Sequence, residues 1–307
     1  MITIVSEKIL MMFMILALGV VCLKSGIFNE EVIKRLSTFL LQVINPIVIF
    51  VSYQRTFTKD LLDNLLIAFA VSVLAFVLQI AIASLSIRKR SANVAVERVS
   101  VIYANCGFFG IPLAAALFGS EGVFYLTGYL TVFYLFFWTH GIILMAGSTS
   151  RREVMKNLFS PAIIGVVLGL ISFLAQVQLP KIVVESMDLV GSMNTPLAML
   201  VAGATLAQSS ILPSLKNPRI YLVSLLKLII VPCLVAFVLA FIPVSEKILL
   251  VIIVAAATPV GAANTMLAIR YNKDSAYASR LFVSSTLFAV VTIPVVVIFA
   301  QFLGIAP

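Results

Sequence analysis

The sequence predicts an all-α polytopic membrane protein of ten transmembrane helices, built as a 5+5 inverted repeat with broken helices 4 and 9. Hydrophobic residues make up 62% of the chain and charged residues only 11%, whereas soluble domains carry roughly 25% charged residues. Apolar runs long enough to cross about 30 Å of hydrocarbon recur from end to end. Proline-containing motifs of the first half also have counterparts in the second half.

Short polar or charged connections separate the apolar runs, and no stretch is left for a soluble domain. The first run is too long for the apolar core of a signal peptide, and no small-residue cleavage site follows it, so we expect it to be the first span. The predicted spans cover residues 7–24, 32–53, 62–87, 96–118, 121–146, 161–178, 184–208, 217–242, 247–268 and 276–303.

The loop charges predict the orientation in the membrane. Lysine and arginine concentrate in the odd-numbered connections, and the opposite side carries few of them: Lys8, Arg55, Lys59, Lys181 and Lys247. Cytoplasmic loops of membrane proteins are enriched in these residues. We therefore expect a cell-membrane protein with both termini outside. The net charge of +9 then reflects topology rather than nucleic-acid binding.

An odd number of spans in each half means that the second half enters the membrane from the other face. The first repeat is expected at 1–146, a basic cytoplasmic loop at 147–160 and the second repeat at 161–307. Span 2 contains Asn45 and Pro46, and span 7 contains Asn194, Thr195 and Pro196. We interpret these polar and proline residues as a hinge, or as the lining of a cavity shared with the broken helices.

Spans 4 and 9 contain the strongest helix breakers. Proline removes a backbone donor and glycine weakens a helix, so both segments should unwind near the middle of the membrane. Half-helix ends and freed carbonyl groups can hold an anion or a cation there; kinked helices with close packing are the alternative. The predicted substrate-binding residues in these spans are Asn105, Gly107, Gly110, Pro112, Thr258, Pro259, Gly261, Asn264 and Thr265.

Three further ionisable residues stand out. Lys227 is the one basic residue deep within a predicted span, so it joins the predicted substrate site, either attracting an anion or pairing with a carbonyl at the break in span 9. The single histidine, His140, is expected to be hydrogen-bonded near an interface, and Asp188 to lie at a solvated helix end. No catalytic, metal-binding or cofactor motif appears, and no buried proton-relay acid is evident, so we expect neither an enzyme nor a metal or cofactor.

The segments Asn105–Pro112 (NCGFFGIP), Thr258–Asn264 (TPVGAAN) and Lys227–Pro232 (KLIIVP) resemble the auxin efflux carrier family in its short prokaryotic form, and the resemblance covers essentially the whole chain. It implies a fold similar to bile-acid symporters and sodium/proton antiporters, in which the broken helices 4 and 9 cross at the centre of the transport domain. Spans 1, 2, 6 and 7 would form a scaffold that often dimerises, and spans 3–5 and 8–10 a moving transport domain. Family substrates are organic anions, including auxin, malate and malonate. The short loop 147–160, and Asn264 where plant carriers have a second proline, argue against auxin itself.

The leading hypothesis is a secondary transporter, working in the efflux direction, of a small organic carboxylate such as malate, malonate or an auxin-like acid. It would work by an elevator movement in a homodimer among membrane lipids, and sodium or a proton is the candidate coupling cation. A sodium-coupled organic-anion symporter is the alternative, and a channel or a receptor is less favoured because no ring-forming filter is present.

Overall fold

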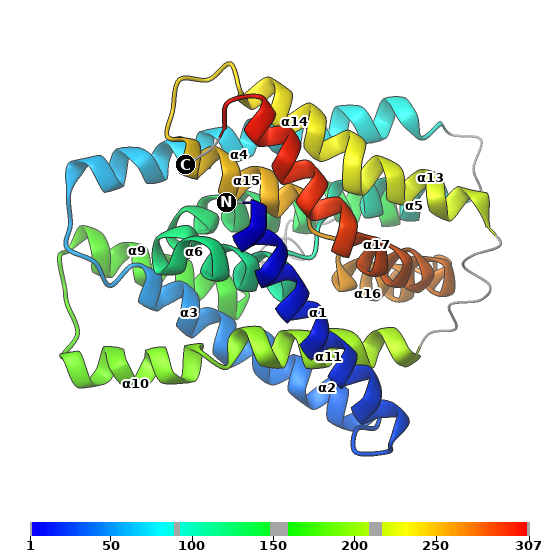
Figure 1. The fold of residues 1–307 in the computed structure, drawn as a ribbon, viewed down its shortest axis with the longest axis horizontal. Helices are drawn as coiled ribbons and strands as arrows, with labels where there is room; N and C mark the ends of the chain where they lie inside the picture. The colour runs from blue at the N-terminus through cyan, green and yellow to red at the C-terminus, as the bar shows by residue number, and fades with distance from the viewer. Residues whose placement is uncertain (1, 89–92, 148–158, 209–216, 306–307) are drawn as a thin grey trace.

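The computed structural model describes residues 2–88, 93–147, 159–208 and 217–305, and these residues form an all-helical protein (Figure 1). Seven helical stretches in this part of the chain are long and apolar enough to cross a membrane. The prediction of an all-α polytopic membrane protein is confirmed, while the ten-helix count and the inverted repeat stay predictions. Most of the predicted basic loop, residues 148–158, lies outside the described residues.

The helices of the described chain follow one another with short connections. The first half contains α1 (Ile2–Lys24), α2 (Glu30–Phe39), η1 (Leu40–Ile44), α3 (Asn45–Ser52), α4 (Lys59–Ser86), α5 (Val94–Ile102), η2 (Cys106–Gly110), α6 (Ile111–Phe136), η3 (Phe137–Gly141) and α7 (Ile142–Ala146). The second half contains α9 (Pro161–Leu174), α10 (Lys181–Gly191), α11 (Asn194–Gln208), α13 (Pro218–Leu225), η4 (Leu226–Ile230), α14 (Val231–Leu239), α15 (Glu246–Ala257), α16 (Ala262–Arg270) and α17 (Ser275–Phe302).

Several predicted spans differ from the helices of the structure. Cys106–Ala146 is one apolar stretch of 41 residues, but Gly119 has φ 60° and ψ −151° and turns the chain within α6. The predicted span 161–178 is too long, because α9 ends at Leu174. Gln176 adopts a left-handed conformation with φ 55°, and Val177 donates its N–H back to the carbonyl of Ser172 at 2.9 Å. This C-terminal hydrogen bond closes the helix.

Three of the four described π-helical turns share one position relative to a proline. η1, η2 and η4 each end two residues before Pro46, Pro112 and Pro232 respectively. In each case, the N–H of the residue just before the proline bonds to the carbonyl five residues back. Proline clashes with the carbonyl four residues before it and offers no donor, so the wider turn accommodates the ring without ending the helix. η3 has no such proline.

The centre of the molecule is α15, in which every residue from Ile248 to Ala257 is buried. It packs against α4, α6, α14 and α17, which explains why this helix is apolar on all sides. At the periphery, α1 packs along α11. A Cβ atom on Gly19 would overlap the Leu200 carbonyl, and one on Gly203 would overlap the Leu16 carbonyl. These two glycines therefore set the close approach of the two helices.

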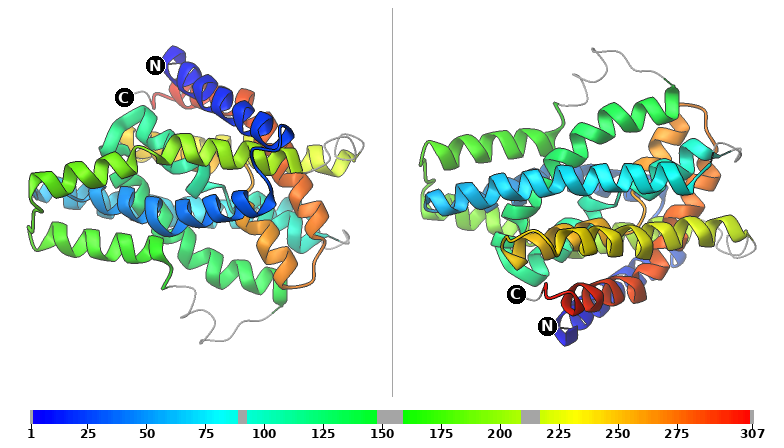
Figure 2. Two further views of the ribbon diagram at one scale, coloured as in Figure 1. Left: turned by 90° about the horizontal axis from the view of Figure 1, so that it is seen from below. Right: turned by 90° about the horizontal axis from the view of Figure 1, so that it is seen from above.

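The long helices run roughly along the long axis of the molecule, with α2–η1–α3 beside α10–α11 (Figure 2). α1 and α17 are inclined to this direction and pack against each other. The two ends of the chain lie next to each other in all views (Figures 1 and 2). The interrupted pairs α5/η2 and α15/α16 lie among these helices and form the candidate site.

Candidate functional site

Two helices are interrupted inside the protein. α5 ends at Ile102 and the chain becomes helical again at Cys106, whereas α15 ends at Ala257 and α16 begins at Ala262. The interrupted residues 103–105 and 258–261 are buried. A helix interruption leaves carbonyl and N–H groups without their usual partners, and such groups are costly inside a membrane protein.

Backbone N–H and carbonyl groups of the two interruptions hydrogen-bond to each other. Ala104 and Val260 form an isolated antiparallel bridge. Asn105 N–H donates to the Pro259 carbonyl at 2.8 Å, and Gly261 N–H donates to the Tyr103 carbonyl at 3.1 Å. The two segments thus form a short strand-like crossing, which we call the crossing (residues 103–105 and 258–261). The Val260 N–H donates to the Ser285 hydroxyl on α17 at 3.0 Å.

The break in predicted span 4 is displaced from the glycines that suggested it. Gly107 and Gly110 lie within the π-helical turn η2, and Pro112 is the second residue of α6. The chain unwinds just before them, at residues 103–105. The wide turn η2 accommodates Pro112, as η1 and η4 accommodate Pro46 and Pro232. Gly107, Gly110 and Pro112 therefore lie in a widened helix and do not end it. In the second interruption, Pro259 and Gly261 do lie in the non-helical segment.

Asn105 is the last residue of the first crossing segment and Asn264 lies three residues after the second; both are buried, with exposed fractions of 4% and 0%. Asn105 Oδ1 accepts the N–H of Phe108 at 3.4 Å and so caps η2. Asn264 Nδ2 donates to the carbonyl of Tyr103 at 3.1 Å and more distantly to that of Val99 at 3.4 Å. Within the described chain, Asn105 Nδ2 and Asn264 Oδ1 have no hydrogen-bond partner. The crossing therefore offers one open donor and one open acceptor.

Lys227 lies in η4 and its side chain is fully buried. Its Nζ donates to the Ala256 carbonyl at 3.0 Å, in the last turn of α15. Of the two roles considered from the sequence, the structure thus contains the pairing with a carbonyl at the break in predicted span 9. This arrangement also places a positive charge beside the partial negative charge of a helix C-terminus.

The two threonines of the predicted site have different environments. Thr258 is buried, and its hydroxyl donates to the Ala255 carbonyl at 2.8 Å, so its proton is already used within α15. Thr265 lies half-buried on α16. The Thr258 hydroxyl is therefore less available to a ligand than the two asparagine amides.

The polar residues near Pro46 and Pro196 meet directly. Asn194 Nδ2 donates to Asn45 Oδ1 at 2.7 Å, and Asn45 Nδ2 makes a longer contact with the Gly107 carbonyl at 3.4 Å. The two asparagines are buried, whereas Thr195 is half-buried and Pro196 is exposed. An amide chain thus connects α11 and α3 to η2, and through η2 to Asn105.

Sequence reasoning missed three residues around the crossing. Tyr103 supplies the carbonyl that two donors share, and Ser285 caps the Val260 N–H; neither residue type carries a sequence signal for such a role. Glu97 is buried, with 1% of its side chain exposed. Arg219 Nε and Nη2 each donate to it at 2.9 Å, and Tyr277 donates at 3.2 Å. Asp188, by contrast, is exposed, as expected.

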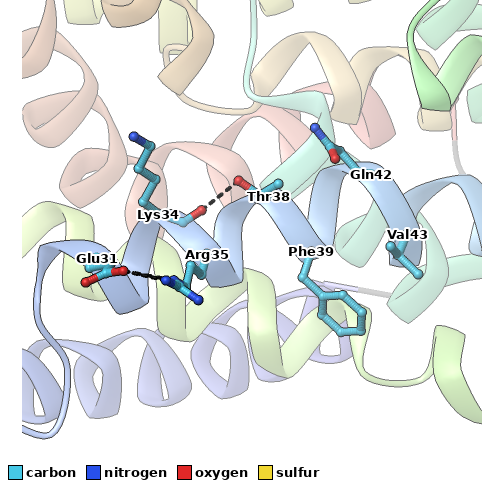
Figure 3. A pocket seen from close by; sticks show the side chains of 7 residues that line it. All are labelled: Glu31, Lys34, Arg35, Thr38, Phe39, Gln42 and Val43. Carbon is cyan, nitrogen blue, oxygen red and sulfur yellow. Dashed lines mark hydrogen bonds and ion pairs between the residues drawn. The ribbon is translucent and has the colours of Figure 1, made fainter.

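A shallow surface groove lies elsewhere, along α2 and η1 (Figure 3). Its lining combines charged residues at one end with apolar residues at the other: Glu31, Lys34, Arg35, Thr38, Phe39, Gln42 and Val43. Glu31 and Arg35 pair with each other at 2.6 Å, and none of the predicted substrate-binding residues lines the groove. We therefore place the candidate site at the crossing.

Comparison with known proteins agrees with a function in transport. A sequence profile of the family described as membrane transport protein matches residues 4–159 and 149–297. An uncharacterized transporter of Methanothermobacter thermautotrophicus is 28% identical over 298 residues, which cover 94% of this chain and 96% of that protein.

Proposed function

Because the chain belongs to the membrane transport protein family, the family of the auxin efflux carriers, we propose that it carries a small organic carboxylate across the cell membrane and binds it at the crossing. Malate, malonate and auxin-like acids represent the substrate class. The observation that carries this proposal is the unpartnered amide of Asn105, buried beside the crossing. Buried amide donors are almost always hydrogen-bonded, and a carboxylate oxygen is a suitable acceptor.

The charges around the crossing favour an anion. Lys227 brings a buried ammonium group to the end of α15, and Asn105 is the N-cap of η2, where the helix dipole is partially positive. Asn264 Oδ1 provides an open acceptor for a hydroxyl group such as that of malate. Gly107, Gly110, Pro112 and Pro259 shape the backbone around these groups.

The proposed mechanism is an elevator movement. The inverted repeats 1–146 and 161–307 would supply a scaffold from spans 1, 2, 6 and 7, and a transport domain from spans 3–5 and 8–10. The long contact from Asn45 to the Gly107 carbonyl joins these two parts and is weak enough to be exchanged during such a movement. The protein would act as a homodimer with both termini on the extracytoplasmic side. An uncoupled anion carrier would favour efflux, since one charge is worth about 2.3 kcal/mol per 100 mV.

The decisive experiment measures uptake of radiolabelled malate and malonate into proteoliposomes. Asn105→Asp keeps the oxygen that caps η2 but replaces the open donor with an anionic acceptor, so transport should be lost. The double variant Asn105→Ala plus Asn264→Ala should also be inactive. Asn29→Ser, at the exposed N-cap of α2, is the control and should transport normally. Unchanged transport by the double variant would refute the site.

Open oxygen atoms support a second candidate, a sodium-coupled symporter. Asn264 Oδ1 and Asn194 Oδ1 are buried and unpartnered in the described chain, and carbonyl-type oxygens are ligands for hard cations. Sodium would then raise both the uptake rate and the thermal stability of the protein, because a ligand that binds only the folded state stabilises it. Equal uptake in sodium and in choline buffers would exclude this coupling.

A further inference from the structure

The wide turn η3 is the one described π-helical turn without a proline behind it, and it contains the only histidine of the chain. Wide turns of this kind are frequent at functional sites because they reorient side chains. η3 turns His140 toward Tyr103, the residue that enters the first interruption: His140 Nδ1 lies 2.9 Å from the Tyr103 hydroxyl. A Cβ atom on Gly141 would meet the Tyr103 ring at 3.2 Å, so η3 and Tyr103 are closely packed.

The hydrogen bonds determine which nitrogen of His140 carries a proton. The Tyr103 hydroxyl also donates to the Phe136 carbonyl at 2.9 Å. A carbonyl can only accept, and a tyrosine hydroxyl has one hydrogen. The bond between Tyr103 and His140 therefore requires that Nδ1 be protonated and act as the donor. Nε2 is then the position that gains a proton when the ring becomes charged.

Tyr103 connects this histidine to the crossing. Its side chain contacts His140, while its carbonyl accepts both the Gly261 N–H at 3.1 Å and the Asn264 amide at 3.1 Å. A change in the bond between His140 and Tyr103 thus acts on the residue that positions both the second interruption and Asn264.

The charged groups around His140 are few in the described chain. α5, which packs against α7, brings Arg98 into electrostatic range of the imidazole, but the Arg98 guanidinium is hydrogen-bonded to the carbonyls of Ser84 and Ile87. α5 also carries Glu97, which is paired with Arg219. α16 packs against α7 and has one charged residue, Arg270. The other titratable groups of this region are Tyr103, which directly follows α5, and Tyr134 on α6.

We propose that His140 and Tyr103 form a proton-responsive positioning pair, which makes anion binding at the crossing depend on protonation of the single histidine. The identity of the ligand in this inference rests on the proposed function, whereas the interaction between His140 and Tyr103 does not depend on it. Protonation adds a positive charge and strengthens the bond from Nδ1 to the Tyr103 hydroxyl. The anion should therefore bind more tightly at acidic pH, where His140 is protonated, than at higher pH, where it is neutral.

The pair is tested first without any substrate. In protein labelled with ¹⁵N-histidine, the single histidine gives one set of ring signals, and we expect the neutral tautomer protonated at Nδ1. Tyr103→Phe removes the hydroxyl and should shift the population toward the Nε2 tautomer. The fluorescence of the only tryptophan, Trp138 in η3, should titrate with the histidine and lose this response in His140→Gln. An unchanged tautomer in Tyr103→Phe would overturn the proposal.

The second test measures malate transport with equal pH on both sides of the membrane, from about pH 5 to about pH 8, where carboxylates are largely ionised. The KM should rise about fivefold across this range, a typical allosteric coupling. His140→Gln, which keeps a donor but cannot become charged, should have the same high KM at every pH. A pH profile of His140→Gln like that of the unmodified protein would overturn the proposal. If malate is not carried at all, the proposed function fails, and the tautomer experiment alone decides on the pair.

Discussion

Gly261 lies where the two interrupted backbones come closest. A Cβ atom at this position would meet the carbonyl oxygens of Ala104 and Tyr103 at 3.2 and 3.3 Å. These are backbone atoms, which the crossing itself holds in place through the Gly261 N–H and the Asn105 N–H. The residue is therefore required because of a close approach of two chains, not because of its conformational freedom.

We predict that Gly261→Ala separates the two segments and impairs both folding and transport. Overpacking of this kind costs about 1–3 kcal/mol, so the melting temperature in detergent should fall and anion uptake should be lost. Gly191→Ala is the matched control: its added Cβ atom would meet only a methyl group of Val48, at 3.2 Å, and this side chain can move. Equal effects of the two substitutions would contradict the role given to Gly261.

Among the helices, the wide turns determine which side chains reach the crossing. The turn η4 precedes Pro232 and contains Lys227. A π-helical turn changes the rotation of the preceding residues relative to a regular helix, so it contributes to directing the ammonium group of Lys227 toward the Ala256 carbonyl. The same device in η2 places Asn105 and Gly107 before Pro112. Proline thus acts on the site from five or more residues away.

We expect Pro232→Ala to weaken anion binding without unfolding the protein. Alanine restores a donor and relieves the clash with the preceding turn, so η4 should relax toward a regular α-helix and turn Lys227 away from Ala256. Binding of malate, measured by thermal shift, should weaken at least tenfold, while the ligand-free melting temperature changes little. Pro294→Ala in α17 is the control, because Pro294 lies inside a helix with no π-helical turn before it. Tight binding by Pro232→Ala would refute this interpretation of η4.

At the scale of the whole molecule, a buried carboxylate joins three helices that are distant in sequence. Glu97 on α5 binds Arg219 on α13 and Tyr277 on α17. The Arg219 guanidinium contacts both carboxylate oxygens, and 38% of the Arg219 side chain is exposed. In the proposed architecture, all three helices belong to the transport domain, so this cluster would help that domain to move as one body.

We predict that Glu97→Gln strongly destabilises the protein. The substitution removes the charged acceptor of Arg219 and Tyr277, and losing buried hydrogen bonds of this kind costs about 1–3 kcal/mol. Water stabilises part of the Arg219 charge, which limits the loss. Glu31→Gln breaks the exposed pair with Arg35 and should cost less than about 1 kcal/mol. The melting temperatures of the two variants in the same detergent provide the comparison. Similar losses would mean that Glu97 is not structurally important.

The class of the protein could be predicted from the sequence because apolar length is a direct physical requirement of a membrane. The helix breakers also predicted where to look for the interruptions, and Pro259 and Gly261 lie in one of them. The displacement at Gly107 and Pro112 could not be predicted, since a proline can end, kink or widen a helix depending on its packing. Tyr103 and Glu97 were missed because their roles depend on contacts with residues far away in the chain.

The neighbouring positions of the two chain ends have a consequence for the order of the halves. α1 and α17 pack against each other, and the ends lie side by side in every view (Figures 1 and 2). A short linker could therefore join them, and a new start could be opened between α7 and α9. Such a circularly permuted gene would synthesise the second half first. Because the crossing pairs one segment from each half, we expect it to form whichever half is synthesised first.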